Sequence, residues 1–315
     1  CDRFKTNNGC GAQVAISQST DAPDGFANSM KWETTTADTS IAANDSFLIR
    51  YTFEGQDLQD MQKGTSSAKQ VTLSFYAKSV KQGTFIVELM DDDNSSRHVN
   101  KSFTISNTNW NRYTITFPAD TTGAFNNDNL SSMDMNFWLV AGTSYTTGTL
   151  QTTWGASAVA NRAVGQVNAM DSTSNNFYLT GVQLEVSDHA TSFEHRSYSQ
   201  ELQLCKRYYQ MFSTGVNTYT GLTSFYYNST RIETMVRYEP QMRTSPSLEQ
   251  GSGSNYFILY SNNQADTFDG FGGINAGCNL SGSLYQTTGL SGTAGHAGGL
   301  YLNSPDAYIA FTAEL

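Results

Sequence analysis

Apolar and polar residues alternate along most of the first 190 residues of the chain. Segments such as FLIRYTF at 47–53 and VTLSFYA at 71–77 place every second apolar side chain on one face, which is the period of a half-buried β-strand. Turn-forming Gly, Asn, Asp and Ser separate such segments at spacings that favour two packed antiparallel sheets over a parallel βαβ fold. A jelly roll is the expected form of this sandwich. The predicted strands are 13–19, 28–36, 47–53, 71–77, 85–89, 103–105, 113–117, 133–139 and 178–186.

Two segments interrupt this regular spacing. Residues 55–64 (GQDLQDMQKG) place Leu58 and Met61 three apart and contain no β-branched residue, which predicts a short helix or turn across one end of the sandwich. Residues 142–171 form a long connection rich in Thr, Ala, Asn and Gly. A connection of this length inside a compact domain is expected to be functional or partly structured.

The period of the pattern changes near residue 197. Ser197 and Gln200 have the spacing of a capping box, and apolar residues then recur at helical spacing as far as Tyr209, which predicts a short helix at 197–207. Strand patterns return after this helix. Residues 289–299 (GLSGTAGHAGG) are too rich in glycine for a regular strand and are expected to form a loop. The later predicted strands are 208–212, 219–227, 232–238, 257–260, 268–274, 280–285 and 307–314.

The predicted fold class is therefore all-β with two domains. A jelly-roll β-sandwich is expected at 1–196, a linking helix at 197–207, and a smaller C-terminal β-sandwich at 208–315.

Composition narrows the class of protein. With 18 basic and 28 acidic residues the formal charge is -10, which argues against a nucleic-acid partner. An aromatic content of 12% excludes a disordered chain, and a charged content of only 15% excludes a coiled coil. No apolar run approaches the roughly 20 residues of a membrane span, so no membrane insertion is expected. The polarity comes instead from Ser, Thr, Asn and Gln, which suits an extracellular β-rich surface.

The chain begins at Cys1 and not at Met, so we expect a processed product or a part of something longer, with an N-terminal piece missing. The four cysteines are Cys1, Cys10, Cys205 and Cys278, and none has a CxxC spacing. A small Cys1–Cys10 loop in an oxidising compartment is one interpretation. Unlinked thiols in a protein assembled in a reducing cytosol are the favoured one.

The segment 179–209 resembles a junction in tail-fibre and other virion proteins of tailed bacteriophages. The resemblance is carried by LTGVQLEV at 179–186, TSFEHR at 191–196 and CKRYY at 205–209. Upstream, SQSTDAPDGF, GTSSAKQVTLSFYAKS and ITFPADTTG are similar to the same family, so the likeness covers most of 14–210. Ser192 stands where the family usually has proline, which leaves that linker less rigid.

The resemblance implies a carbohydrate-binding-module-like jelly roll in a virion protein. It implies a tail-fibre or receptor-binding segment that is assembled in the host cytoplasm, acts outside the cell, contacts other virion proteins, forms homotrimers and adheres to host-surface glycan. A capsid head fibre or decoration protein is the alternative. A secreted glycan-degrading enzyme is a third class.

No catalytic motif supports the enzyme class. The four histidines, His98, His189, His195 and His296, lack HExxH or HxH spacing, and the chain has no GxSxG elbow or Walker loop. No pair of carboxylates stands out as suited to glycoside hydrolysis. The sequence therefore predicts a protein that is not an enzyme.

Sugar recognition combines aromatic rings, which stack on sugar C–H faces, with polar groups that bind hydroxyls. Trp110 (SNTNWNRY) and Trp154 (QTTWGAS) are the candidate carbohydrate-binding residues, because each lies in a polar setting. The alternative is that each ring packs under its own loop. Trp32 and Trp138 lie in strand patterns and are expected in the core. In the second domain Tyr226, Tyr227 and Tyr238 are expected in an exposed cluster or an intersubunit core.

The one dense acidic cluster is 91–94 (DDDN). Its carboxylates could bind a hard cation, but the spacing lacks the distal glutamate of an EF-hand, so a solvated turn is favoured. No cofactor is expected from the residues alone. The resemblance to carbohydrate-binding jelly rolls, which often hold structural Ca²⁺, keeps Asp91 and Asp93 as candidate metal ligands.

Overall fold

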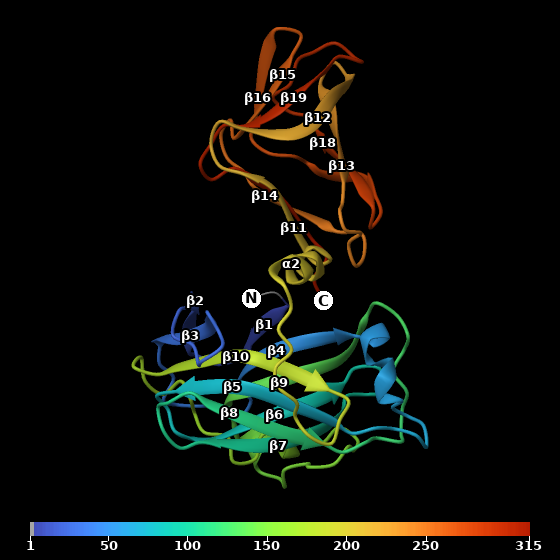
Figure 1. The fold of residues 1–315 in the computed structure, drawn as a ribbon. Coiled ribbons are helices and arrows are strands. Elements are labelled where there is room, and N and C mark those ends of the chain that lie inside the picture. Colours follow the sequence, from blue (N-terminus) through green and yellow to red (C-terminus); the bar gives the residue numbers. More distant parts are fainter. Residues whose placement is uncertain (1–2) are drawn as a thin grey trace. The chain divides into compact units, whose positions relative to one another are not determined.

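The computed structural model describes residues 3–315, and the chain divides into two compact units. Residues 3–195 form the first unit and Arg196–Glu314 the second. Nearly all regular structure in both units is antiparallel β-sheet, which confirms the predicted all-β class (Figure 1). Within these residues, no helix combines the length and apolar character that a membrane span requires.

The first unit is a jelly-roll sandwich of two five-stranded sheets. One sheet has the order β1 (Phe4–Asn8), β4 (Ser46–Glu54), β9 (Ser131–Ala141), β6 (Gly83–Asp91), β7 (Arg97–Ile105). The other has the order β2 (Gln13–Ser19), β3 (Ser29–Thr36), β10 (Asn176–Glu185), β5 (Val71–Ser79), β8 (Asn111–Phe117). Strand β1 was not predicted, because its sequence FKTNN has no apolar alternation.

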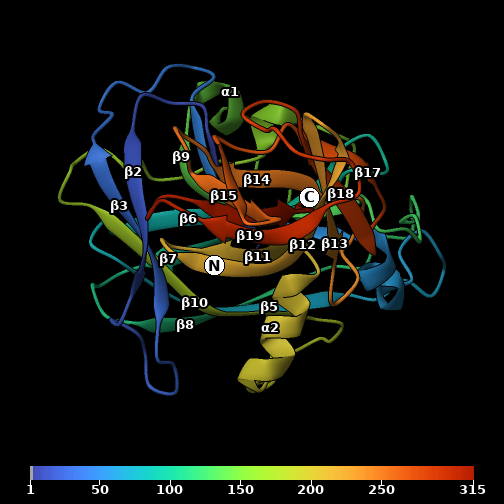
Figure 2. The same cartoon turned by 90° about the horizontal axis from the view of Figure 1, so that it is seen from above.

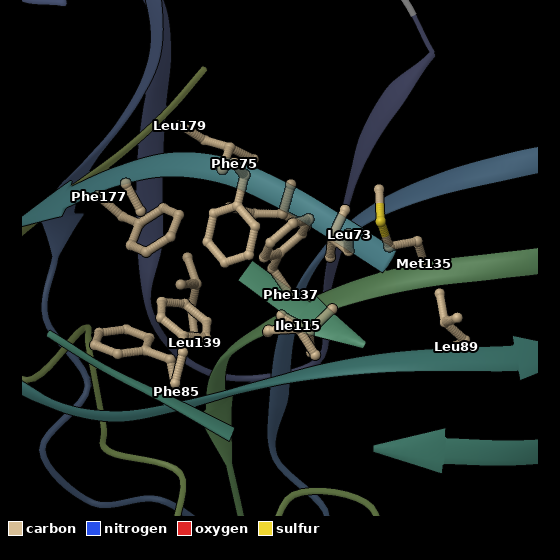
Figure 3. Packing of buried hydrophobic residues seen from close by; sticks show 14 of the residues in the cluster. Leu73, Phe75, Phe85, Leu89, Ile115, Met135, Phe137, Leu139, Phe177 and Leu179 are labelled. Carbon is tan, nitrogen blue, oxygen red and sulfur yellow. The ribbon is translucent and has the colours of Figure 1, made fainter. Parts of the chain in front are cut away.

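The period-two residues of both sheets meet between the layers. Phe75 of β5 contacts Phe137 of β9 with ring centroids 5.1 Å apart, and Phe85 of β6 lies 5.6 Å from Phe177 of β10 (Figure 3). Trp32 is buried in this core, as predicted. Burial of these rings is the main force that holds the two sheets together.

The two interruptions take the expected forms. Residues Gly55–Met61 form a 3-10 helix, η1. The long connection contains α1 (Thr143–Thr146) and η2 (Val159–Asn161), and is tied to β7 by a bridge between His98 and Gly155. This connection covers the outer face of its sheet, so Trp138 is buried beneath it and not between the sheets.

The predicted helix is confirmed as α2 (Tyr198–Lys206), and its N-terminus is a capping box. The Ser197 hydroxyl accepts from the backbone N–H of Gln200 at 3.3 Å, and the Gln200 side chain accepts from the Ser197 N–H at 3.0 Å. These bonds satisfy two donors that a helix start leaves open.

The second unit packs a three-stranded sheet against one face of a seven-stranded sheet (Figure 2). The small sheet has the order β11 (Tyr209–Thr214), β20 (Tyr308–Thr312), β14 (Ser247–Gly251). The large sheet has the order β16 (Gln264–Phe268), β15 (Phe257–Ser261), β19 (Ala297–Leu302), β12 (Thr218–Asn228), β13 (Arg231–Arg237), β18 (Ser281–Gln286), β17 (Gly273–Gly277).

Three expectations for this unit are corrected. The last three residues of the glycine-rich segment predicted as a loop, 297–299, form the start of strand β19. Glycine suits this strand because it leaves room for the Tyr219 ring at Gly299. The predicted strand 268–274 is interrupted, since β16 ends at Phe268 and β17 begins at Gly273. Tyr226 and Tyr238 lie in the core, where they pack with residues of both sheets, and only Tyr227 of that trio is exposed.

Cys1 lies outside the described residues. Within the part of the chain that is described, Cys10, Cys205 and Cys278 form no disulfide.

Candidate functional site

Trp110, just before β8, lies in a cluster of aromatic and charged side chains on the first unit. Its half-buried indole packs edge-to-face against Tyr178 of β10, with ring centroids 6.0 Å apart. The indole Nε1 donates to Oδ1 of Asp21 at 2.8 Å. These two contacts fix the orientation of the Trp110 ring.

Two lysines complete the cluster. The Nζ of Lys78 lies 5.4 Å from the Tyr178 ring centroid and 2.6 Å from Oδ2 of Asp21. The Nζ of Lys31 lies 5.9 Å from the same ring centroid. Hydrogen bonds from Lys78 and Trp110 hold the pKa of Asp21 below its usual value, so the carboxylate stays charged. We call Asp21, Lys31, Lys78, Trp110 and Tyr178 the Trp110 cluster.

The sheet order explains why these residues meet. Strands β3, β10 and β5 are neighbours, and Phe177 and Leu179, which flank Tyr178, point into the core. Tyr178 and the two lysines therefore share the outer face of the sheet. The side chains of Lys31, Lys78 and Asp21 are 21%, 25% and 39% exposed, so their polar atoms can reach a ligand. A ring of fixed orientation beside ammonium and carboxylate groups suits the binding of a polyhydroxylated ligand.

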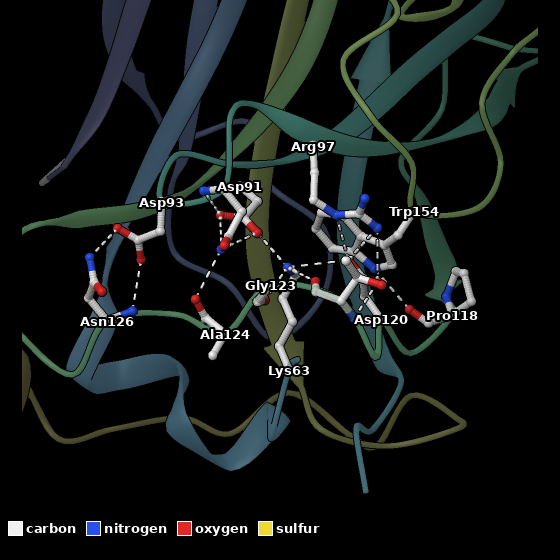
Figure 4. A network of polar contacts seen from close by, with 12 residues as sticks. Lys63, Asp91, Asp93, Arg97, Pro118, Asp120, Gly123, Ala124, Asn126 and Trp154 are labelled. Carbon is white, nitrogen blue, oxygen red and sulfur yellow. Dashed lines mark hydrogen bonds and ion pairs between the residues drawn. The ribbon is translucent and has the colours of Figure 1, made fainter. Parts of the chain in front are cut away.

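Trp154 lies in a different environment, at one end of the sandwich (Figure 4). Its Nε1 donates to the carbonyl of Pro118 at 3.0 Å, and the Nζ of Lys63 lies 5.1 Å from its ring centroid. The ring packs against the main core as well. Trp154 is thus partly buried, with its ring between Lys63 and the core.

Lys63 is the centre of this second cluster. Its buried ammonium group pairs with Asp91, lies 3.2 Å from Oδ2 of Asp120, and donates to the carbonyls of Thr122 and Gly123 at 3.0 and 2.7 Å. Its side chain is only 1% exposed. Oxygen atoms thus surround the ammonium group as they would surround a metal ion.

This arrangement does not fit a calcium ion at Asp91. The Lys63 ammonium group takes the place that a cation would need beside that carboxylate. Asp93 is turned elsewhere, because its oxygens accept from the backbone N–H and side-chain amide of Asn126 at 2.9 and 2.8 Å. In residues 3–315 no group of three or more His, Cys, Asp or Glu side chains is placed to hold a metal.

The outer face of the other sheet carries a buried charged row beneath the long connection. Arg162 donates to both Glu88 oxygens at 2.7 Å, and Asn136 donates to Glu88 at 3.0 Å. Arg50 donates to Asn136 at 2.9 Å and pairs with Asp134 at 2.8 Å. Each carboxylate in this row has a basic partner, so the row fastens the connection to the sheet.

The pKa of Asp134 rises to about 6, chiefly because burial disfavours its charged form. The nearby carboxylate of Asp92 raises the pKa further, while Arg50 and a hydrogen bond from Thr52 oppose the rise. A raised pKa is typical of a general acid, but the Asp134 side chain is only 3% exposed.

Sequence reasoning named Trp110 as a candidate and did not name the residues that surround it. Asp21, Lys31 and Lys78 lie on three separate segments, and only the strand order brings them together. Lys63 was missed for the same reason, since Asp91 and Asp120 are distant in the sequence. The sequence held only a weak signal for the two lysines. Lys31 and Lys78 each alternate with apolar residues in their strands, which places them on the face of the strand that points away from the core.

No protein-family profile and no curated protein sequence matches the chain. Solved structures with similar folds are carbohydrate-binding modules and a phage tailspike domain. The enzymatically active domain of bacteriophage CBA120 tailspike protein 4 is 11% identical with a TM-score of 0.34; the match covers 59% of this chain but only 19% of the tailspike chain. The family 11 carbohydrate-binding module of the cellulosomal cellulase Lic26A-Cel5E of Clostridium thermocellum is 16% identical with a TM-score of 0.31, covering 62% of this chain and 91% of the module. At these values the similarities carry no conclusion about what this chain binds.

Proposed function

We propose that the chain is a structural protein of a bacteriophage virion, a tail-fibre or related receptor-binding segment that adheres to host-surface glycan. Its action is adhesion without chemistry. Trimeric association would multiply weak individual sites, because linked sites raise avidity far beyond that of one site. A capsid head fibre or decoration protein is the alternative, in which the same sandwich serves for attachment.

The Trp110 cluster is the observation that carries glycan binding. It presents an oriented indole, which packs on the buried ring of Tyr178, together with partly exposed ammonium and carboxylate groups on one sheet face. Sugars offer C–H faces to rings and hydroxyls to polar groups, so this combination matches their chemistry.

The pairing of the buried carboxylates supports binding over hydrolysis. Glycoside hydrolysis needs two carboxyl groups that face the scissile bond, one of them as a proton donor. In the first unit Glu88 pairs with Arg162, Asp91 with Lys63, and Asp134 with Arg50. In these three pairs the carboxylate oxygens are engaged by basic groups of the chain itself.

The virion role rests on the junction segment that resembles phage fibre proteins. Its parts occupy β10, the segment 186–196, which begins with a bend and has no regular secondary structure, and the capped helix α2. Electron microscopy of intact particles labelled with an antibody to residues 1–190 tests this role. Label on the tail supports the fibre, label on the capsid shell supports the head-fibre alternative, and particles without label refute both.

Glycan binding at the Trp110 cluster is tested with purified host-surface polysaccharide and the full chain. We expect Trp110→Ala to weaken binding roughly tenfold, since it removes the stacking ring. Tyr198→Ala is the control, because Tyr198 is an exposed aromatic residue on α2, in the second unit. Equal binding by wild type and Trp110→Ala would remove the cluster from the proposal.

A further inference from the structure

The seven-stranded sheet of the second unit packs one face against the three-stranded sheet, and its other face carries aromatic rings. Leu300 and Leu302 of β19 point into the core, so Tyr301 between them points outward and Gly299 lies on the same outer face. The strand register places Tyr219 of β12 opposite Tyr301 and Tyr260 of β15 opposite Gly299. The three tyrosines therefore share the outer face.

These tyrosines form a continuous row across β15, β19 and β12. The ring centroids of Tyr260 and Tyr301 are 5.0 Å apart, and those of Tyr301 and Tyr219 are 4.7 Å apart. Tyr219 is 54% exposed and Tyr260 is 48% exposed. The row spans two strand spacings, roughly 10 Å, which is comparable to the length of a disaccharide.

Gly299 has no side chain, and this leaves room for the Tyr219 ring above strand β19. A Cβ atom at this position would lie 2.5 Å from Cε2 and 2.7 Å from Oη of Tyr219, so the ring would have to move to make room for it. The outer end of the Tyr219 ring therefore lies directly over the backbone of β19. A ring held down on a glycine presents its other side to solvent.

The hydroxyl groups of Tyr219, Tyr260 and Tyr301 make no hydrogen bond to any residue in 3–315. The hydroxyl of the buried Tyr226 in the same unit, by contrast, donates to Asp266. The row thus offers apolar ring surface together with three uncommitted donor–acceptor groups. Its neighbour Thr223 is exposed and opposite Gly299, which adds a fourth hydroxyl.

We propose that the row formed by Tyr219, Tyr260 and Tyr301 is a second carbohydrate-binding site, which takes a neutral pyranose oligosaccharide. The inference rests on the proposed adhesion to glycan and adds a site in the second unit.

The chemistry of the row favours a sugar over a protein partner. The site has no formal charge of its own, so it suits a neutral ligand. The ring faces can contact the C–H groups of a sugar, and the phenol and threonine hydroxyls beside them can bind its hydroxyl groups. Two sites on one chain, repeated in an oligomer, would also strengthen adhesion through avidity.

The test uses isothermal titration of the full chain with glucan, galactan and mannan oligosaccharides. Wild type is compared with Tyr219→Ala, Tyr260→Ala and the double variant, with Tyr198→Ala as an exposed tyrosine outside the row. Each single variant is expected to bind roughly tenfold more weakly to at least one oligosaccharide, and Tyr198→Ala to bind as wild type does. Near-ultraviolet circular dichroism checks that each variant is folded, and the Tyr219→Phe variant, which keeps the ring, is expected to retain most of the affinity.

The outcomes separate this site from the general proposal. Wild-type binding that survives the double variant but is lost in Trp110→Ala overturns the tyrosine row and leaves glycan adhesion intact. Absence of wild-type binding to these oligosaccharides and to host-surface polysaccharide overturns both. A drop in molecular mass by light scattering in the double variant, with sugar binding unchanged, would show that the row joins copies of the chain, and would also overturn the site.

Discussion

The ammonium group of Lys63 is ion-paired with the carboxylate of Asp91, and both side chains are excluded from solvent. Asp120, which also pairs with Arg97, is the second carboxylate beside this ammonium group. Burial of charges is costly unless each is paired and hydrogen-bonded, and here every partner is supplied by the chain itself. The ion pairs of the buried Lys63 ammonium group therefore stabilise this end of the sandwich.

Removal of that cation should destabilise the first unit strongly. Lys63→Met would leave two buried carboxylates without their ammonium partner, so we expect the free energy of unfolding to fall by about 3–5 kcal/mol. Urea denaturation measures this change. Lys81→Met is the matched control, because Lys81 pairs with Asp171 at a partly exposed site and should cost less than about 1 kcal/mol. Equal losses in the two variants would contradict the account.

Calcium should not affect the stability of the wild-type chain. Lys63 occupies the cation position beside Asp91, and Asp93 is bonded to Asn126. A ligand stabilises a fold only if it binds the folded state, so neither added calcium nor a chelator should shift the thermal midpoint. A midpoint that falls on chelation would show that a calcium site exists after all.

Asp134 should make stability decrease as the pH rises from about 4 to about 6. Its pKa is about 6 in the folded chain, against 3.8 as the ordinary value, so the folded state holds the extra proton in this interval. Ionisation then costs stability, up to roughly 3 kcal/mol by pH 7. Asp134→Asn cannot ionise, so its free energy of unfolding relative to wild type should increase over the same interval. Urea denaturation at several pH values measures the difference.

Asp21→Asn should change the pH dependence of stability in the opposite direction to Asp134→Asn. The pKa of Asp21 is lowered by Lys78 and Trp110, so wild type gains stability from this group as the pH rises, and the variant loses that gain. Parallel pH profiles of wild type and Asp134→Asn would contradict the assignment of a raised pKa to Asp134.

Gly299→Ala should disturb the tyrosine row without unfolding the second unit. The new Cβ would displace the outer end of the Tyr219 ring, which can move because the side chain is exposed. We expect the unfolding free energy to change by less than about 1 kcal/mol and oligosaccharide affinity to fall several-fold. Titration calorimetry and urea denaturation measure the two quantities. Unchanged affinity would show that the position of the Tyr219 ring does not matter.

The sequence predicts correctly those helices and strands that a pattern of neighbouring residues defines. The alternation at 47–53 and 71–77 predicted β4 and β5, and the Ser197–Gln200 spacing predicted the cap of α2. Strand β1 has no such alternation, because its side chains are mostly exposed; it is held by pairing with β4 and by the packing of Phe4 against Tyr51. Strand β19 was not predicted, because its sequence is rich in glycine. The sheet accommodates these glycines where a neighbouring ring fills the space.

The sites depend on long-range pairing, which periodicity does not reveal. Trp110 was a candidate because its surroundings are polar, whereas Trp154 in an equally polar segment packs over Lys63. The tyrosine row joins three strands that are distant in the sequence and adjacent in the sheet. Residue type and spacing therefore predicted the kind of chemistry, and the strand order decided which residues meet.

Adhesion to glycan without catalysis is the central claim, and one incubation tests it most directly. Purified host-surface polysaccharide is mixed with the full wild-type chain, and bound protein and newly formed reducing ends are measured in the same sample over time. The account predicts saturable binding, weakened by Trp110→Ala, with no increase in reducing ends. A steady release of reducing ends that Asp134→Asn abolishes, or a complete lack of binding, would contradict it.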